Sequence, residues 1–319
     1  MSLARETQTA AVAPTAPPAS GMRDTRCMIC DTRDHDRQVY AMNFRPEDLN
    51  PDVFSARRLP DRLHYRMVRC TQCGLLRSDP ILSDEDLGRL YSGSHFTYAA
   101  EAVFTGTTYL DYLRETLPLV RERGRIMEIG CGSGFFLERA LDEGFAEAWG
   151  AEPSVAAVEQ ASERVRSRIR IGLYDRTTFA PEQFDLICAF QILDHAPDPA
   201  AMVRACVEHL RPGGIVLFIN HDAGALSARL LGELSPIVDV EHTVLFDQGT
   251  MRHLFEHCGL RVQRVFSVRN TYPLHYWAKM APLPGPLKEG IRSVLERSGL
   301  GRVPVTLKAG NLGLIAMKA

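Results

Sequence analysis

The sequence of 319 residues contains no apolar run approaching the roughly 18 residues that a membrane helix needs. Its first 25 residues are rich in Ala, Pro and Thr, but they lack the continuous apolar core of a secretion signal. We therefore expect residues 1–25 to form a disordered tail. We also expect a soluble cytoplasmic protein that neither inserts into a membrane nor is exported.

The sequence also lacks an excess of charge of either sign. Its 37 Lys and Arg residues stand against 39 Asp and Glu residues, which gives a net charge of −2. This balance provides no general attraction to nucleic acid or to an anionic membrane. Five arginines between residues 57 and 69 leave a local basic patch open, although such a cluster is more often a solvated face. A small-molecule substrate is expected, and a homodimer stays open.

Four of the eight cysteines form two closely spaced pairs, Cys27 with Cys30 and Cys70 with Cys73. Thiolates spaced in this way can all point at one tetrahedral ion about 2.3 Å away, so they predict a structural zinc site with no open position. Disulfides or free thiols are the alternative, and a reducing compartment disfavours disulfides. We expect a zinc-binding module and a linking helix over residues 26–100, with the helix capped by Ser83.

From residue 125 onward, short apolar runs alternate with amphipathic ones, as expected for βαβ units on a parallel sheet. Residues 125–129 are the predicted first strand, and Gly130, Gly132 and Gly134 form the turn into a helix. Glycines let the backbone turn sharply and approach a ligand, while the helix amides beyond them point at it. A dinucleotide site would need G-x-G-x-x-G, but Phe135 stands in place of the last glycine. This departure disfavours an NAD(P)-dependent oxidoreductase, which remains an alternative.

Acidic residues mark the ends of the first two predicted strands. Glu128 lies at the end of the first strand, and Glu152 follows the second, predicted over residues 148–151. A carboxylate at the tip of the second strand can accept hydrogen bonds from both hydroxyls of a ribose, so Glu152 is the predicted ribose ligand. An acid placed there only to stabilise a helix N-terminus is the alternative. The third strand, predicted over residues 168–172, puts Tyr174 where an adenine would lie.

The fourth strand is predicted over residues 184–190, a buried apolar run, and the fifth over residues 215–220. Gln191 and His195 leave the carboxyl end of the fourth strand. Open α/β sheets bind their ligands at that end, so both side chains are candidates for a site.

The motifs E-x-G-x-G-x-G, FDLICAFQILDHAPDP and LRPGGIVLFIN follow one another, with an acid ending the second strand between the first two. Over residues 125–220 the chain thereby resembles the class I methyltransferases that use S-adenosylmethionine. The front half, C-x-x-C…C-x-x-CGLLRSDPILSDEDLGRLY, is similar to a branch with an N-terminal zinc-binding module, which includes methyltransferases of deoxysugar and natural-product pathways. The resemblance implies an α/β fold with a Rossmann-like, doubly wound, seven-stranded sheet. Its antiparallel last strand has candidates at residues 260–268 and 311–318.

The resemblance also implies roles for individual residues. Gly130, Gly132 and Gly134 would contact the methionyl part of S-adenosylmethionine, Glu152 its ribose, and Gln191 the neighbourhood of its sulfonium. Glu128 and Tyr174 complete the expected set of cofactor-binding residues. The implied acceptor is a sugar, a nucleotide sugar or a glycosylated natural product. A zinc-containing RNA methyltransferase is the alternative, against which the net charge counts.

Methyl transfer to a hydroxyl needs a base that removes a proton. Glu241-His242 precedes TVLFDQGTMRHLFEHCGL, which resembles the E-H-x-x-x-F stretch of the sugar-methylating branch, where this pair lies beside the acceptor. His242 is the predicted base, oriented by a hydrogen bond that its ring N–H donates to the Glu241 carboxylate. Asp239 stands where that branch has a tyrosine. His242 could instead pack beneath the helix that begins near Thr250, and His195 is the second candidate base.

Residues 271–304 contain aromatic residues and prolines between the last two predicted strands. Within a methyltransferase domain over residues 101–319, they are expected to form a lid or substrate wall. The carbon-methylating sugar enzymes carry a longer C-terminal domain, whereas this chain ends at Ala319. That difference favours transfer to oxygen or nitrogen.

Overall fold

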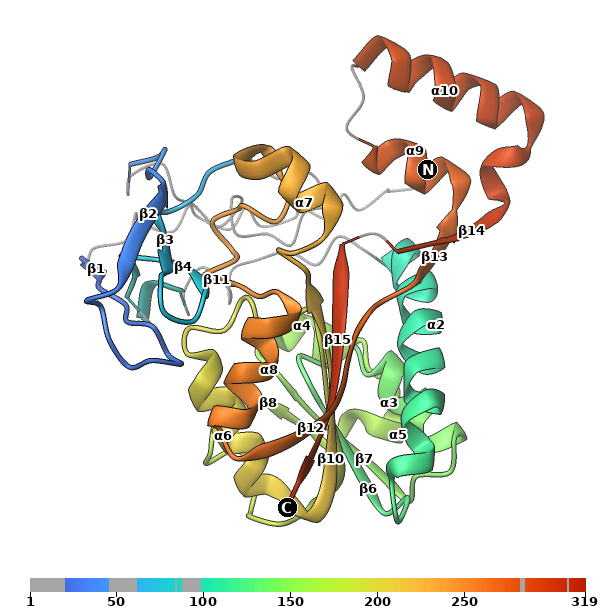
Figure 1. Cartoon of the computed structure of the whole chain (residues 1–319). Helices are drawn as coiled ribbons and strands as arrows, with labels where there is room; N and C mark the ends of the chain where they lie inside the picture. Colours follow the sequence, from blue (N-terminus) through green and yellow to red (C-terminus); the bar gives the residue numbers. More distant parts are fainter. Residues whose placement is uncertain (1–20, 46–61, 84, 88–98, 282–284, 309) are drawn as a thin grey trace, which may run out of the picture.

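The computed structural model describes residues 21–45, 62–83, 85–87, 99–281, 285–308 and 310–319 (Figure 1). Residues 1–20 of the predicted tail and residues 88–98 of the predicted linking region lie outside these ranges. The prediction of a tail is wrong for residues 21–25. There, β1 (Met22–Arg23) pairs with β5 (Ile81–Leu82), and the Thr25 amide donates to the Asp79 carboxylate at 2.7 Å.

Seven strands form one sheet in the order β12-β15-β10-β9-β6-β7-β8. In chain order they are β6 (Arg125–Ile129), β7 (Glu147–Glu152), β8 (Ile169–Ile171), β9 (Phe184–Phe190), β10 (Leu210–His221), β12 (Leu260–Ser267) and β15 (Asn311–Lys318). β15 runs antiparallel to both β10 and β12, while β8, β7, β6, β9 and β10 are parallel. The predicted seven-stranded sheet with an antiparallel last strand is confirmed.

Helices cover both faces of this sheet (Figure 1). One face carries α2 (Ala99–Thr116), α3 (Phe135–Asp142), α4 (Val155–Glu159) and α5 (Glu163–Arg166), and the other carries α6 (Pro199–His209) and α8 (Gln248–His257). Successive strand residues point to opposite cores, since Ile126 packs under the first group and Met127 under the second. Burial on both sides explains why β9 is almost continuously apolar.

The front of the chain shares a sheet and a core with the rest of the molecule. A second, four-stranded sheet has the order β11-β4-β3-β2 and contains β2 (Asp36–Tyr40), β3 (Met67–Cys70), β4 (Leu76–Ser78) and β11 (Val244–Leu245). β11 therefore joins the front module from far along the chain. Cys27 and Cys70 lie in the same hydrophobic cluster as Met251 and Leu254 of α8. The module thus packs directly on the face that carries α6 and α8.

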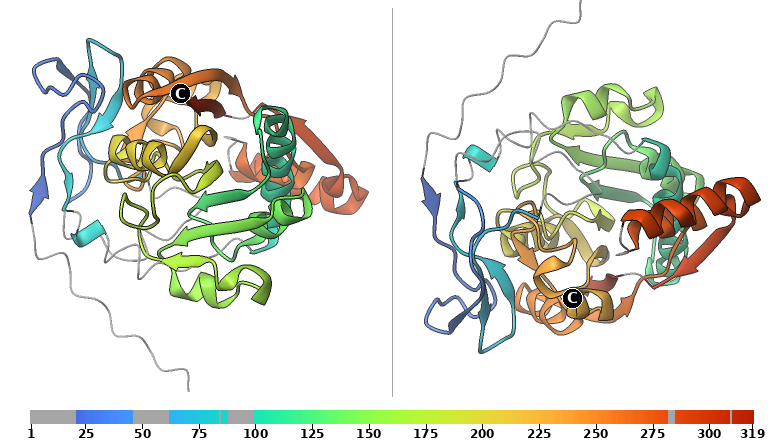
Figure 2. Two further views of the ribbon diagram at one scale, coloured as in Figure 1. Left: turned by 90° about the horizontal axis from the view of Figure 1, so that it is seen from below. Right: turned by 90° about the horizontal axis from the view of Figure 1, so that it is seen from above.

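Residues 270–281 and 285–307 form a separate arm between β12 and β15. In it, β13 (Asn270–Pro273) pairs with β14 (Pro304–Leu307), and α9 (Leu274–Met280) and α10 (Gly285–Ser298) lie between them. Figure 2 shows α10 and the front module on opposite sides of the large sheet. The role of this arm as a lid or substrate wall stays a prediction.

The remaining elements are short: α7 (Leu226–Leu231) and the 3₁₀ turns η2 (Leu117–Leu119), η3 (Gly232–Leu234) and η4 (Leu300–Arg302). Across the part of the chain that the structure describes, no helix combines the length and the apolar character required to span a bilayer.

Candidate active site

The glycine loop lies at the carboxyl end of β6, in the middle of the large sheet. Gly130, Gly132 and Gly134 all adopt positive φ angles, of 69°, 53° and 75°. Side chains other than glycine are strained in this region, so the loop depends on all three glycines. The loop leads directly into α3, whose first amides face the same edge of the sheet.

The surroundings of the three glycines differ. A Cβ on Gly130 would lie 2.4 Å from Cδ1 of Ile192, and one on Gly134 would lie 2.8 Å from Cγ2 of Val165. A Cβ on Gly132 would meet no atom of the described residues within 4 Å. Gly130 and Gly134 are therefore closely packed by the protein, whereas Gly132 exposes bare backbone to open space, as a ligand cradle requires.

Glu152 connects the end of β7 to this loop. Its Oε2 accepts a hydrogen bond from the Gly132 amide at 2.8 Å, and its Oε1 accepts one from the Ser154 amide at 2.8 Å. Burial raises the pKa of this carboxyl, and the two amide hydrogen bonds oppose the rise. The carboxylate lies at the predicted place, next to the glycine loop, and each oxygen keeps a lone pair for a further donor.

Two other buried oxygens near the loop have no hydrogen-bond partner among the described residues, Oε2 of Glu128 and Oε1 of Gln191. Burial, followed by repulsion from Glu152, raises the pKa of Glu128 well above its usual range. Gln191 adopts a positive φ of 57°, and its amide donates to the Ile219 carbonyl at 2.7 Å. Unpaired buried acceptors are costly. The ammonium group and ribose hydroxyls of S-adenosylmethionine are donors of the kind these oxygens lack, so the residues fit that cofactor.

Tyr174 is the exception among the predicted cofactor residues. Its side chain is buried, and its hydroxyl lies 2.7 Å from Nδ1 of His209 in α6. The ring packs edge-on against His209 beneath the sheet. The prediction that Tyr174 contacts an adenine is therefore wrong, because its only polar atom is already paired inside the core. The side chain of the neighbouring Leu173, in contrast, is 54% exposed.

A second group of side chains gathers where β9 and β10 end. Asp194 follows β9, and its Oδ2 lies 2.6 Å from Nδ1 of His221, the last residue of β10. His242 lies between two other imidazoles, with ring centroids 4.5 Å from His195 and 4.7 Å from His221. We call these four residues, Asp194, His195, His221 and His242, the histidine cluster. The predicted candidates His195 and His242 are thus brought together.

Burial and neighbouring charges shift the pKa values of three residues in the histidine cluster. Burial alone would raise the pKa of Asp194, but the adjacent imidazoles, His221 first, hold it well below its usual range. Burial and the two neighbouring imidazoles hold the pKa of His242 well below its usual range. Burial also lowers the pKa of His195, against the attraction of Asp194. At neutral pH the cluster therefore pairs an ionised Asp194 with uncharged rings at His195 and His242.

The predicted pairing of Glu241 with His242 stays a prediction. The charge of the Asp194 carboxylate acts on His242, and no described residue lies within hydrogen-bond distance of Nδ1 of His242. Neighbouring residues project in different directions, and the Glu241 amide instead donates to the Asp239 carboxylate at 3.1 Å. Asp194 and His221 are functional candidates that the sequence prediction missed. Their position at the carboxyl ends of adjacent strands is the signal that could have found them.

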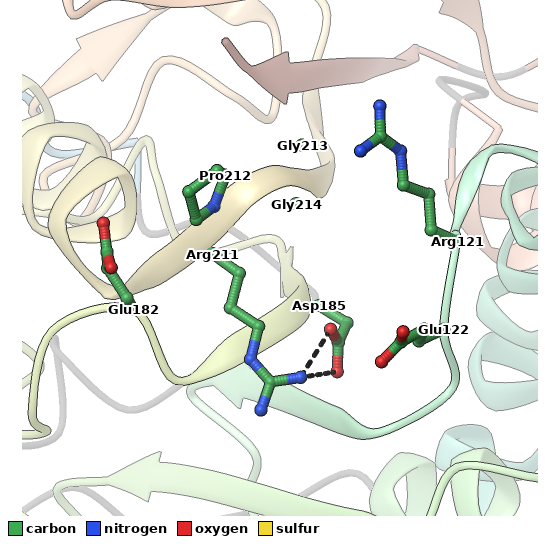
Figure 3. Close-up of a pocket in the computed structure, with 8 residues that line it drawn as sticks. All are labelled: Arg121, Glu122, Glu182, Asp185, Arg211, Pro212, Gly213 and Gly214. Atoms are coloured by element: carbon green, nitrogen blue, oxygen red, sulfur yellow. Dashed lines mark hydrogen bonds and ion pairs between the residues drawn. The ribbon is translucent and has the colours of Figure 1, made fainter.

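The opposite edge of the sheet contains a hollow lined by Arg121, Glu122, Glu182, Asp185, Arg211, Pro212, Gly213 and Gly214 (Figure 3). Asp185 and Arg211 form an ion pair across it at 2.9 Å. Asp185 lies at the start of β9. Gly214 lies in the first half of β10, immediately before Ile215, which pairs with Leu186 of β9. The hollow therefore lies at the amino ends of the strands, away from the glycine loop and the histidine cluster.

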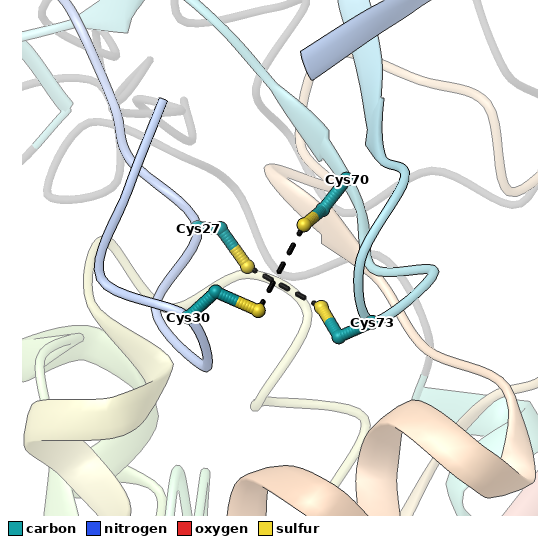
Figure 4. A group of neighbouring side chains, drawn as sticks. All are labelled: Cys27, Cys30, Cys70 and Cys73. Carbon is teal, nitrogen blue, oxygen red and sulfur yellow. Dashed lines mark hydrogen bonds between the residues drawn. The ribbon is translucent and has the colours of Figure 1, made fainter. Parts of the chain in front are cut away.

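The four paired cysteines converge on one point, although they come from segments far apart in the chain (Figure 4). The Sγ atoms of Cys27 and Cys73 lie 3.4 Å apart, those of Cys30 and Cys70 lie 3.9 Å apart, and all four lie within 4.8 Å of one another. Four thiolates around zinc at 2.3 Å would be separated by about 3.8 Å. The arrangement fits a four-cysteine zinc site, and all four thiols are free of disulfides.

Known proteins agree with the class that the fold and the glycine loop define. A family model described as a methyltransferase domain matches residues 101–265, just over half of the chain. The ubiquinone biosynthesis O-methyltransferase of Xylella fastidiosa (strain 9a5c) is 30% identical over 185 residues, which cover 50% of this chain and 69% of that relative. The corresponding enzyme of Stutzerimonas stutzeri (strain A1501) is 33% identical over 116 residues, 34% of this chain and 50% of the relative.

Among solved structures, a SAM-dependent methyltransferase from Archaeoglobus fulgidus is 16% identical, with a TM-score of 0.47 and coverage of 70% of this chain and 100% of that one. The chain spans between half and about two thirds of the length of the two curated relatives. It belongs to the methyltransferase domain family and is a class I S-adenosylmethionine-dependent methyltransferase. The oxidoreductase alternative is thereby set aside.

Proposed function

We propose that the protein transfers the methyl group of S-adenosylmethionine to a hydroxyl oxygen of a small molecule. The observation that carries the proposal is the histidine cluster at the carboxyl ends of β9 and β10. Ile192, which packs against Gly130, lies in the same turn as Gln191 and Asp194, so one short segment borders both the glycine loop and the cluster. The two curated relatives are named O-methyltransferases, which supports oxygen as the acceptor.

The cofactor supplies a methyl group made electrophilic by positively charged sulfur. The backbone at Gly132 and the carboxylate of Glu152 would hold its methionyl and ribose parts, and Glu128 and Gln191 would accept hydrogen bonds from its donors. The protein must also align the acceptor oxygen with the methyl carbon and remove the hydroxyl proton. The cofactor residues cannot do this, because they are committed to backbone amides or deeply buried.

We assign the proton acceptor to His221. Asp194 fixes its Nδ1 at 2.6 Å, which leaves Nε2 to receive a proton and places a carboxylate to stabilise the imidazolium. The His221 side chain is 26% exposed and can reach an acceptor, whereas His242 is buried and has a pKa well below its usual range, which makes it a weak base. We therefore assign to His221 the role that the sequence analysis predicts for His242.

The acceptor class that we propose is a sugar-containing small molecule. Its support is the likeness of the N-terminal cysteine module to the branch that methylates deoxysugars. The module also borders the proposed acceptor side, because β4 pairs with β11 two residues after His242. We further propose that Cys27, Cys30, Cys70 and Cys73 hold a structural zinc ion, on the basis of their convergence.

Incubation of the full chain with S-adenosylmethionine carrying a ¹³C-methyl group, together with nucleotide sugars and glycosylated metabolites, tests the proposal. We expect S-adenosylhomocysteine and one O-methylated product, identified by ¹³C NMR. His221→Gln should reduce turnover by about 100-fold or more while binding S-adenosylhomocysteine normally. A methyl group on nitrogen or carbon, or methylation of RNA alone, would contradict the proposal.

A further inference from the structure

Three side chains of the histidine cluster present one potential ligand atom each to a common centre. They are a carboxylate oxygen of Asp194 and one ring nitrogen each of His195 and His242, and the three atoms lie within 4.8 Å of one another. Oδ1 of Asp194 and Nε2 of His195 are 4.0 Å apart. Ligand atoms about 2.1 Å from one ion in tetrahedral geometry lie about 3.4 Å apart, so the most widely separated pair must close in by at most about 1.4 Å.

Two of these residues carry buried polar atoms that nothing in the described protein satisfies. Oδ1 of Asp194 and Nδ1 of His242 have no hydrogen-bond partner, although the residues are only 1% and 8% exposed. Buried acceptors are almost always paired, and leaving a carboxylate oxygen and an imidazole nitrogen unpaired in one place is doubly costly. A single cation between them would satisfy both lone pairs.

The other polar atoms of the three side chains are already held. Oδ2 of Asp194 is bonded to His221, the His195 ring interacts with the Glu241 backbone, and the His242 ring interacts with the Ile237 backbone. Ligating histidines and carboxylates are typically oriented in this way, by hydrogen bonds from their second polar atom.

We propose that Asp194, His195 and His242 form a second metal site, separate from the four cysteines, which binds a divalent first-row transition ion such as Zn²⁺. Two imidazoles and one carboxylate suit such an ion better than Mg²⁺ or Ca²⁺, which prefer oxygen ligands alone. Three protein ligands leave a coordination position open. The open position can face the solvent side of the cluster, where the His195 side chain is 23% exposed.

The site has a defined use if the proposed function is correct, on which this step rests. The acceptor hydroxyl would bind at the open position, where the ion lowers its pKa. Its proton moves to Nε2 of His221, and the O–H electron pair stays on oxygen. That oxygen forms the bond to the methyl carbon, while the electron pair of the C–S bond goes to sulfur. Asp194 then serves two partners, the ion through Oδ1 and His221 through Oδ2.

Titration of the full chain with Co²⁺, followed by visible absorption, tests the site. The protein is first loaded with one Zn²⁺ at the cysteines, because Co²⁺ bound there would give thiolate-to-cobalt charge-transfer bands of its own. We expect one equivalent of Co²⁺ to bind at sub-millimolar concentration with d–d bands of nitrogen and oxygen ligands and without thiolate charge-transfer bands. Asp194→Asn and His242→Gln should each weaken binding at least about tenfold. His253→Gln, an exposed histidine on α8, is the matched control and should bind as the wild type does.

Absence of any d–d band from the wild-type protein up to millimolar Co²⁺ would overturn the proposal, and this result needs no variant to fold. Binding that is equally strong in Asp194→Asn and His242→Gln, with unchanged circular dichroism, would also overturn it. The two proposals remain distinguishable. O-methylation without Co²⁺ binding refutes only the metal site, and Co²⁺ binding without methyl transfer to oxygen refutes only the proposed function.

Discussion

At the scale of single residues, the charge of Glu128 should depend on pH and on whether the cofactor site is filled. Its pKa is raised well above the usual range in the folded chain, by burial and by Glu152. A carboxyl of this kind contributes stability that is complete below its unfolded pKa, near 4.3, and is lost as the pH rises through the folded pKa. The melting temperature of the ligand-free wild type should therefore fall, relative to Glu128→Gln, as the pH rises from about 4.3 through neutrality.

Saturating S-adenosylhomocysteine should reduce this difference, because its ammonium group favours the ionised carboxylate. Differential scanning fluorimetry at several pH values, with and without the ligand, measures both effects. Melting temperatures of the two proteins that change in parallel across this range would show that Glu128 is not the titrating group.

Replacing two glycines of the loop by alanine should have different effects, mainly on cofactor affinity for Gly132 and mainly on stability for Gly134. Gly132→Ala meets no atom of the described chain within 4 Å, so it should cost only the strain of a positive φ, about 1–2 kcal/mol, while its methyl group fills the cofactor side of the loop. Gly134→Ala adds a contact of 2.8 Å with Val165 and should destabilise more. Calorimetry should show a loss of S-adenosylhomocysteine affinity in Gly132→Ala out of proportion to its stability loss. Wild-type affinity in Gly132→Ala would contradict the cradle.

At the scale of elements, β4 and β11 connect the cysteine module to the histidine cluster. The Ser78 amide donates to the Thr243 carbonyl at 2.8 Å, and the Thr243 amide donates to the Asp194 carbonyl at 3.0 Å. Loss of the module should therefore displace His242 and Asp194 before it affects the glycine loop. In Cys70→Ser, we expect turnover to fall at least about tenfold, while S-adenosylhomocysteine affinity changes little. Cys258→Ala, a buried cysteine on the same core, is the control and should keep its activity.

The same module depends on a buried ion pair. Arg77 of β4 is 1% exposed, and its guanidinium donates to both carboxylate oxygens of Asp36 in β2, at 2.8 and 2.6 Å. Asp36→Ala leaves a buried charge without its partner and should lower the free energy of unfolding by about 3–5 kcal/mol. Glu256→Ala removes an exposed pair with Arg252 and should cost less than about 0.5 kcal/mol. Urea denaturation of both variants checks the contrast, and equal losses would refute it.

At the scale of the whole molecule, patterns within single segments were enough to predict the strands of the large sheet. The contacts between distant segments could not be predicted from such patterns. Apolar runs and glycines place β6 to β9 within one residue of their observed bounds, because a strand buried on both faces has few alternatives. The sequence places Asp194 and His221 after two predicted strands, but the two residues meet because β9 and β10 are neighbours in the sheet, which neither segment specifies alone. Tyr174 was predicted to face the cofactor because nothing in its own segment indicates its partner, His209, which is 35 residues away.

The long-range partner of the module is equally invisible in sequence. β11 is two residues long and pairs with β4, which ends more than 160 residues earlier. Such a short strand has no periodicity to detect. The convergence of the four cysteines, in contrast, follows from their own spacing, and the structure agrees with it.

The central claim is that the glycine loop and Glu152 bind the cofactor, while the histidine cluster acts on the acceptor. The dissociation constant of S-adenosylhomocysteine, measured by calorimetry, tests this claim most directly. Wild type, Glu152→Gln and His221→Gln are the three proteins to compare. We expect one bound molecule per chain in the wild type, an affinity at least about tenfold weaker in Glu152→Gln, and wild-type affinity in His221→Gln. No binding to the wild type, or an equal loss in both variants, would contradict it.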